Sequence, residues 1–152
     1  MLKHWSVEER AAWDTSVAQS QDGGLLQSWT WGQFQERLGN AVYNVSNEGK
    51  NIFAQCLQLR AGSQWVFSVP RGPVCLHGST AEQINSFLKD LKAFAKERGC
   101  FLVRLDPAWS RMPVEVAPLL DKSRRERQPV HTLILDTKPT EDAMFAALKS
   151  KW

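Results

Sequence analysis

Residues 100–109, Cys-Phe-Leu-Val-Arg-Leu-Asp-Pro-Ala-Trp, decide the fold because they combine a buried strand with a charged end. Apolar side chains occupy both alternating sets of positions, which is typical of a strand covered on both faces and placed centrally in its sheet. Pro107 ends the strand because proline cannot continue a ladder of hydrogen bonds. Arg104 and Asp106 carry opposite charges two residues apart at this end. They form either an internal ion pair or part of a functional site, and the segment alone favours the ion pair.

The composition predicts one globular domain without a membrane span. The chain has 152 residues, of which 43% are apolar and 23% charged, which fits a soluble protein that buries a core without crosslinks. No apolar run approaches the roughly 20 residues that a membrane-spanning helix needs. The first residues lack the apolar core of a signal peptide, so we expect a cytoplasmic protein. The net charge of +3 permits a polyanionic partner without requiring one.

The cysteines and histidines predict neither a disulfide framework nor a metal site. Three residues of each kind are spread widely, and no pair has the spacing of metal ligands. Reduced, mostly buried thiols are the expectation for the cysteines. The residues concerned are Cys56, Cys75, Cys100, His4, His77 and His131.

Two helices precede the predicted strands. Capping boxes, which pair a Ser or Thr hydroxyl with a Glu or Gln three residues later, begin at Ser6 and at Thr30. Trp29 and Phe34 flank the second cap in the arrangement of a hydrophobic staple, and Gly39 ends that helix. The predicted apolar faces consist of Ala12, Trp13 and Val17 in the first helix, and of Trp31, Phe34 and Leu38 in the second.

Three strands joined by short turns follow, over residues 41–46, 51–60 and 65–69, and they predict an antiparallel meander. The turn at residues 47–50 contains a glycine where a positive φ is expected. The alternation of the long strand slips near Cys56-Leu57, which indicates a β-bulge.

A proline-rich loop and a long helix connect the meander to the opening segment. Val69-Pro-Arg-Gly-Pro-Val74 is expected to hold Arg71 at a strand end, and a solvated turn residue is the alternative. A capping box from Ser79 to Glu82 begins the helix, and Gly99 ends it. A helix that crosses between two strands favours their parallel pairing or close neighbourhood. Its apolar face comprises Ile84, Phe87, Leu88, Leu91, Phe94 and Ala95, and a solvated face is expected for Lys89, Lys92, Lys96 and Arg98.

The last part of the sequence is weakly patterned. Residues 122–127 carry a run of cations, which is either a mobile surface loop or a contact for phosphates. Residues 130–135 are predicted to form the fifth strand. The sequence stops at Trp152 without a helix-ending residue, as a chain cut within an element does. The final helix begins at Pro139-Thr140, with an inward face of Ala143, Met144, Ala147 and Leu148.

The order of elements predicts an α+β fold, a mixed α/β layer of about five strands with flanking helices. An antiparallel meander followed by a strand–helix–strand unit resembles the opening of an acyltransferase of the GNAT type. The sequence contains no Gln/Arg-x-x-Gly-x-Gly/Ala loop, which holds the coenzyme A pyrophosphate at a helix N-terminus. Walker, GxSxG and HExxH motifs are absent as well. These absences argue against acyl-CoA, ATP and zinc chemistry.

Four segments together resemble the first half of the Fem family, the aminoacyltransferases that build peptidoglycan side bridges. Each motif is weak by itself, whereas all four in this order and spacing are fairly specific. The likeness covers nearly the whole chain but only about half of a typical family member. The segments are residues 26–34 (LQSWTWGQF), 69–74 (VPRGPV), 101–107 (FLVRLDP) and 128–136 (QPVHTLILD).

The resemblance implies a GNAT-like subdomain over residues 1–152, the first of two in the full-length protein. Family members transfer an amino acid from aminoacyl-tRNA to the stem peptide of a muramyl-pentapeptide precursor or lipid II. We therefore expect an aminoacyltransferase that uses aminoacyl-tRNA as co-substrate without a cofactor or metal, at the inner face of the plasma membrane or in the cytoplasm. This chain alone is expected to be inactive, and the exposed face left by the second half is expected to associate in solution.

The resemblance also implies roles for particular residues. Asp106 falls where the family pattern places its candidate acidic residue, which accepts a proton from the attacking ammonium. Gln35 and Phe101 fall where some relatives carry a precursor-binding lysine and a tyrosine, and both departures remove a polar contact. Arg71 is a candidate for an anionic group of the precursor. Trp31 and Arg104 complete the binding candidates, and Arg104 is also the expected structural partner of Asp106.

Two other functions stay open on the sequence. A non-catalytic module with the same fold can hold a cell-wall precursor or a protein. An acyl-CoA-dependent N-acyltransferase is disfavoured by the missing pyrophosphate loop. The transferred amino acid, the acceptor position and the oligomeric state do not follow from the sequence.

Overall fold

The computed structural model describes residues 1–20, 23–109, 116, 120–121 and 138–147. The chain divides into two units, residues 1–121 and 122–152, and each is described by itself. The first contains, in order, β1 (Leu2–His4), the 3-10 turn η1 (Val7–Glu9), α1 (Arg10–Gln19), the 3-10 turn η2 (Leu25–Gln27), α2 (Trp29–Arg37), β2 (Ala41–Asn47), β3 (Ile52–Ala61), β4 (Gln64–Pro70), β5 (Val74–Cys75), α3 (Ala81–Glu97) and β6 (Cys100–Asp106). The second contains α4 (Glu141–Ala146).

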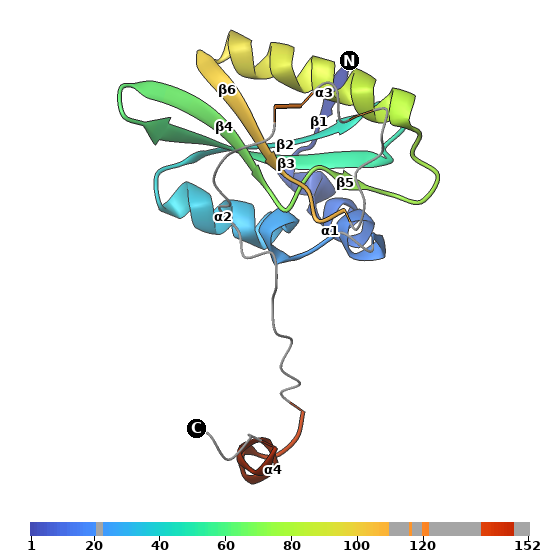
Figure 1. Cartoon of the computed structure of the whole chain (residues 1–152), viewed down its shortest axis with the longest axis vertical. Helices are drawn as coiled ribbons and strands as arrows, with labels where there is room; N and C mark the ends of the chain where they lie inside the picture. Colours follow the sequence, from blue (N-terminus) through green and yellow to red (C-terminus); the bar gives the residue numbers. More distant parts are fainter. Residues whose placement is uncertain (21–22, 110–115, 117–119, 122–137, 148–152) are drawn as a thin grey trace. The chain divides into compact units, whose positions relative to one another are not determined.

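One mixed sheet forms the centre of the first unit. Its hydrogen-bonded order is β1-β2-β3-β4-β6, and β5 pairs with β3 as well. Every pair is antiparallel except β4 and β6, which are parallel and joined through α3. The predicted meander, the parallel crossover and the α+β class are thus confirmed (Figure 1). The short strand β1 is a finding of the structure, since three residues show no period in a sequence.

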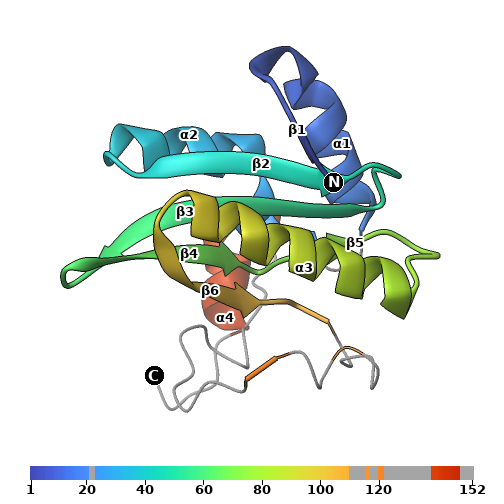
Figure 2. The same ribbon diagram turned by 90° about the horizontal axis from the view of Figure 1, so that it is seen from above.

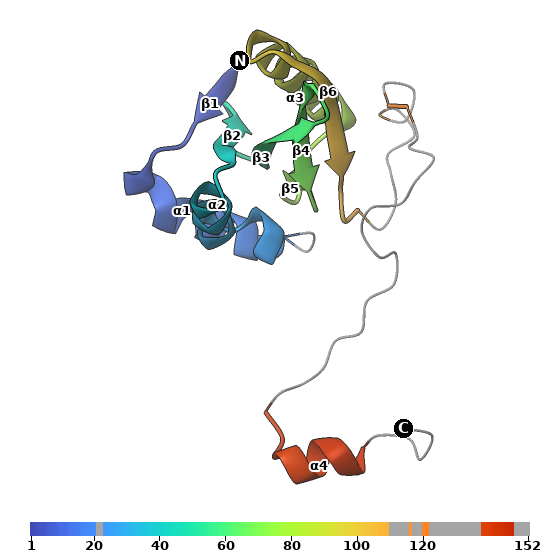
Figure 3. The same cartoon turned by 90° about the vertical axis from the view of Figure 1, so that its left-hand side faces the viewer.

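Helices cover both faces of this sheet, α3 on one face and α1 with α2 on the other (Figure 2, Figure 3). The larger core lies under α3 and includes Val45, Phe67 and Val69 of the sheet. The smaller core lies under α1 and α2 and consists of Trp13, Val17, Trp29, Phe53 and Val74. Alternating residues of the same strands thus feed two separate cores.

The helix α3 has the predicted apolar face. All six predicted positions are buried, and Lys89, Lys92 and Lys96 are exposed as expected. Gly99 ends the helix with a φ of 72°, a left-handed value that favours glycine. The predicted cap is wrong by one residue, because Thr80 accepts from the Gln83 backbone N–H at 3.2 Å while Ser79 donates to the Asn51 carbonyl.

The two N-terminal helices differ more from the prediction. Trp13 and Val17 are buried, but Ala12 is exposed. The cap of α2 is Ser28 and not Thr30. This shift of two residues turns the helix, so its buried face consists of Trp29, Gly32 and Gln35, while Phe34 and Leu38 are 48% and 61% exposed.

Two predictions about strand irregularities are wrong. The register of β2 and β3 runs unbroken past Cys56, because the residues of β3 around it are buried on both faces and no extra residue is needed. The bulge lies instead between β4 and β6, where Trp65 pairs with Cys100 and Val66 with Leu102. In the turn at 47–50, the positive φ of 51° belongs to Lys50 and not to the glycine.

The strand β6 is not central, because it is the last strand of the sheet within the described residues. Phe101 and Leu102 are 59% and 46% exposed. Apolar residues at every position therefore did not identify a strand covered on both faces. The predicted strand at 130–135 and the cation run at 122–127 lie outside the described residues.

The helix α4 begins as predicted, with Thr140 as its N-cap. Its predicted inward face is wrong for the described positions Ala143 and Ala147, which are exposed, while Met144 is half-buried. Leu148 lies outside the described residues. None of the described residues of α4 is buried.

Candidate functional site

The bulge at Phe101 decides which way the end of β6 faces. Val103 and Leu105 pair with Phe67 and Val69, which belong to the core under α3. Directly paired residues present their side chains on the same face of a sheet, and neighbours along a strand alternate. Leu102, Arg104 and Asp106 therefore lie on the opposite face, the one that carries α1 and α2.

Asp106 stands at the end of this polar row. Asp106 as a whole is half-buried, but its Oδ2 atom is fully buried and has no hydrogen-bond partner among the described residues. Its backbone N–H donates to the Gly72 carbonyl at 3.3 Å, which ties the end of β6 to the proline-rich loop. A carboxylate oxygen held out of water without a donor is suited to accept a proton from a bound group.

Arg104 does not form the predicted ion pair with Asp106. Its Nη2 atom donates to the Ser68 hydroxyl at 3.0 Å, and the ion pairs among the described residues do not include one between Arg104 and Asp106. The physical reason is the register: Ser68 is the residue of β4 directly paired with Arg104, so the guanidinium reaches it across the ladder.

The loop of residues 70–73 holds Arg71 at the end of β4, as predicted, and the structure shows that this loop lies beside Asp106. β4 ends at Pro70, which pairs with Asp106, and Arg71 follows in a left-handed conformation with φ of 52°. Arg71 is half-buried. The structure therefore brings three of the predicted residues, Arg71, Arg104 and Asp106, to neighbouring positions at the ends of β4 and β6.

Gln27 holds this loop in place, a role that was not predicted from the sequence. The side chain is fully buried. Its Nε2 donates to the Pro70 carbonyl at 2.6 Å, and its Oε1 accepts from the Gln55 backbone N–H at 2.8 Å. Gln55 pairs with Asn44 of β2 on one side. On the other side of β3, Gln55 lies between the residues paired with β4 and those paired with β5, so the glutamine amide takes the place of a strand there. A lone polar residue in the turn η2 does not reveal such a role in a sequence.

The helix α2 carries Trp31 and Gln35 over β2 and β3. Gly32 allows the close approach, since a Cβ there would lie 2.8 Å from Gln55 Nε2 and 3.2 Å from Val42 Cγ1. Gln35 is buried, and its Oε1 accepts from Asn40 Nδ2 at 2.8 Å. Trp31 is half-buried against Phe34, with ring centroids 5.3 Å apart. Neither side chain has a described contact with Asp106.

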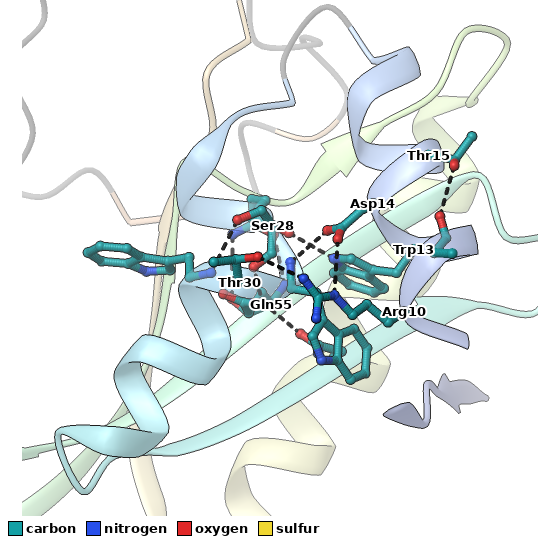
Figure 4. Close-up of polar contacts among 12 residues, drawn as sticks. Arg10, Trp13, Asp14, Thr15, Ser28, Thr30 and Gln55 are labelled. Atoms are coloured by element: carbon teal, nitrogen blue, oxygen red, sulfur yellow. Dashed lines mark hydrogen bonds and ion pairs between the residues drawn. The ribbon is translucent and has the colours of Figure 1, made fainter. Parts of the chain in front are cut away.

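A polar network fixes the start of this helix (Figure 4). The Ser28 hydroxyl accepts from the Trp31 backbone N–H at 3.2 Å, and the Ser28 carbonyl accepts from Gln55 Nε2 at 2.8 Å. Asp14 of α1 accepts from the Trp29 backbone N–H at 2.7 Å. The two helices and β3 are thereby locked to one another, and α2 keeps a fixed position beside the site.

The other reactive groups that the structure describes in the first unit are buried thiols and scattered ionisable side chains. Burial raises the pKa of the Cys56 and Cys100 thiols, which makes both poor nucleophiles. The three cysteines are free thiols, as predicted. In the described part of the chain, no group of His, Cys, Asp and Glu side chains is arranged to hold a metal ion. No helix in that part is long and apolar enough to cross a membrane.

Known proteins define the class to which this fold belongs. A crystal structure of FemX matches with a TM-score of 0.58 and 21% identity over 70% of this chain and 27% of FemX. An acetyltransferase of Trypanosoma brucei matches with a TM-score of 0.56 and 14% identity, over 88% of this chain and 99% of its own. A probable acetyltransferase matches with a TM-score of 0.58 and 12% identity, over 90% of this chain and 99% of its own. The first unit thus has a GNAT-like acyltransferase fold.

The sequence also identifies the family. The model of the FemAB family matches residues 8–133, which is most of the chain, and the protein therefore belongs to the FemAB family. It spans about a quarter of the length of FemX, as the coverage of 27% shows. No curated protein matched the sequence at a significant level.

Proposed function

We propose that this chain is the N-terminal subdomain of an aminoacyltransferase that transfers an amino acid from aminoacyl-tRNA to the stem peptide of a peptidoglycan precursor. Membership of the FemAB family over residues 8–133 carries the proposal. The unpartnered carboxylate oxygen of Asp106 supports it, because this transfer needs a group that accepts a proton.

In the proposed reaction, Asp106 accepts a proton from the ammonium of the stem peptide. The freed amine attacks the carbonyl carbon of the aminoacyl ester, a C–N bond forms, and the C–O bond to the tRNA ribose breaks. The nitrogen then loses a second proton, the leaving ribose oxygen takes up one proton, and Asp106 releases its proton to solvent, so protons balance over the cycle. Arg71 and Arg104 lie near the same strand ends, and the proposal assigns the anionic groups of the precursor to them. Since aminoacyl-tRNA is a cytoplasmic molecule, the reaction takes place in the cytoplasm or at the inner face of the plasma membrane.

The test is the transfer of a labelled amino acid from aminoacyl-tRNA to a muramyl-pentapeptide precursor by the natural gene product. Asp106→Asn keeps the shape of the side chain and removes its basicity. We expect kcat to fall by about 10²–10⁴-fold with KM little changed, the range for loss of a general base. Asp90→Asn, on the exposed side of α3, is the matched control and leaves the rate unchanged.

The two parts of the proposal fail separately in this experiment. If the unaltered protein transfers amino acids and Asp106→Asn does so at the same rate, Asp106 is not the base. If the unaltered protein transfers no amino acid to any precursor offered, the aminoacyltransferase proposal is wrong.

A non-catalytic precursor-binding or protein-binding module is the second candidate. The burial of Gln35 favours it, because that position is engaged with Asn40 and offers a precursor no charged contact. Saturable precursor binding without any turnover is the result that identifies this function. An acyl-CoA-dependent activity has less support, since the sequence contains no Gln/Arg-x-x-Gly-x-Gly/Ala loop before a helix, the loop that holds a coenzyme A pyrophosphate. Micromolar binding of acetyl-CoA is the result that favours it.

A further inference from the structure

Two lysine ammonium groups share one aromatic ring at the sheet end farthest from β6. Lys3 Nζ lies 4.2 Å and Lys50 Nζ 5.4 Å from the centroid of the Trp5 ring. Lys3 belongs to β1, and Lys50 to the turn between β2 and β3. The negative face of an indole attracts each cation, and the ring therefore gathers two like charges in one place.

The Trp5 ring is a fixed platform for these groups. Its Nε1 donates to the Ser46 hydroxyl at 2.9 Å, and its backbone N–H donates to the Asn44 carbonyl at 3.0 Å. The ring also packs against Trp13 and Phe53, with centroids 5.6 Å away in each case. A ring held on several sides does not move aside to separate the two charges.

The turn that carries Lys50 is fixed as well. The Asn47 side-chain Oδ1 accepts from the backbone N–H groups of Asn51 and Ile52 at 3.0 and 3.1 Å. The Lys50 backbone donates to the Asn47 carbonyl at 3.0 Å. The local hydrogen bonds therefore hold the exposed Lys50 side chain beside Lys3.

Of the carboxylates that the structure describes, Glu9 faces the pair, and it neutralises Lys3. Lys3 Nζ donates to Glu9 Oε1, and this bond raises the pKa of Lys3 while it lowers the pKa of Glu9. Lys3 therefore keeps its proton. The side-chain contact with Lys3 lowers the pKa of Lys50 most, followed by the charge of Lys3 and by desolvation. The charge of Glu9 raises the pKa of Lys50 and is the smallest of these effects. Lys50 thus carries the free amine more often than an ordinary surface lysine does at neutral pH.

We propose that Lys50 is an acylation site, an exposed nucleophilic amine that takes an acyl group from an activated ester. The amine lone pair attacks the ester carbonyl carbon, a C–N bond forms, the C–O bond to the leaving group breaks, and the amine proton goes to solvent. A neighbouring cation that lowers the basicity of a lysine is a known means of activating it as a nucleophile. The site is independent of the function proposed for Asp106.

The experiment labels the whole chain with a trace amount of the N-hydroxysuccinimide ester of acetic acid and measures acetylation of each lysine by mass spectrometry. Lys89, Lys92 and Lys96 are exposed and serve as internal controls. At pH 7.5 we expect Lys50 to react at least about threefold faster than these three, as an activated amine does. The advantage disappears above pH ~10.4, where ordinary lysines lose their protons too.

Three variants test the cause. Lys3→Gln removes the neighbouring cation and brings the Lys50 rate down to that of the controls, whereas Lys3→Arg keeps the cation and the high rate. Glu9→Gln removes the neutralising carboxylate and raises the combined labelling of Lys3 and Lys50. Equal rates for Lys50 and the controls in the unaltered chain, or a Lys50 rate that Lys3→Gln leaves unchanged, overturn the proposal. Circular dichroism checks that each variant is folded.

Discussion

The side-chain amide of Gln27 forms hydrogen bonds of the kind that a neighbouring strand forms in a sheet. Its amide offers the Gln55 N–H and the Pro70 carbonyl the partners that a neighbouring strand would supply. The loop it secures also receives the hydrogen bond from the Asp106 backbone through Gly72. The position of the candidate base therefore depends on a residue that touches neither the base nor a substrate.

Gln27→Ala is expected to lower the free energy of unfolding by roughly 2–4 kcal/mol, because it leaves buried backbone groups without partners. Gln19→Ala, an exposed glutamine at the end of α1, is the matched control and changes the free energy of unfolding by less than about 0.5 kcal/mol. Urea unfolding of the whole chain measures both. Equal effects of the two substitutions contradict the assigned role of Gln27.

At the scale of elements, helix starts were the features that the sequence predicted least accurately. Two candidate caps stand side by side before α3, Ser79 with Glu82 and Thr80 with Gln83, and both satisfy the capping pattern. Ser79 is used elsewhere, since its hydroxyl donates to the carbonyls of Asn51 and Leu76. A tertiary contact decides between the caps, and a sequence pattern does not contain it.

Thr80→Ala is therefore expected to destabilise the fold by about 1 kcal/mol, the usual cost of losing an N-cap. Glu82→Ala removes the carboxylate of the rival capping box and is expected to have less effect, within about 0.5 kcal/mol for an exposed site. Chemical denaturation followed by circular dichroism compares the two. A larger loss for Glu82→Ala identifies the rival box as the one in use.

The features that follow from the residues of a single element and its adjoining turns were predicted well. The apolar face of α3 recurs at helical spacing and is buried as expected. The meander follows from short turns between strands of alternating residues. The exposure of Phe101 and Leu102 in β6 could not be predicted, because a strand that is apolar throughout has the same sequence whether or not another element covers its second face.

The candidate site was predicted only in outline. Asp106 and Arg71 were each predicted at the end of a strand, and the structure adds that these two strand ends are neighbours. The partner of Arg104 was wrong, because strand pairing and not sequence distance brings Ser68 to it. Gln35 and Trp31 lie on a helix whose position depends on Gly32 and the Ser28 cap, and neither determinant has a distinctive pattern.

For the whole molecule, both buried clusters belong to residues 1–121. We expect a fragment of residues 1–121 to fold by itself, because it contains every strand and covering helix of the sheet that the structure describes, with a hydrophobic core of its own. A single cooperative transition in thermal unfolding, with retained near-ultraviolet circular dichroism from its buried tryptophans, is the expected result. A gradual transition without near-ultraviolet signal contradicts it.

The bulge at Phe101 makes chain length a determinant of chemistry, but only on one side of it. Phe101 is the extra residue of the pairing, since Cys100 pairs with Trp65 and Leu102 with Val66. Deletion of Phe101 therefore leaves an even pairing and keeps Asp106 on its present face. Deletion of one residue between Leu102 and Asp106 instead turns the carboxylate toward the core under α3, because every later side chain changes face. In an alignment of relatives, a one-residue gap there has the weight of a substitution at Asp106 itself.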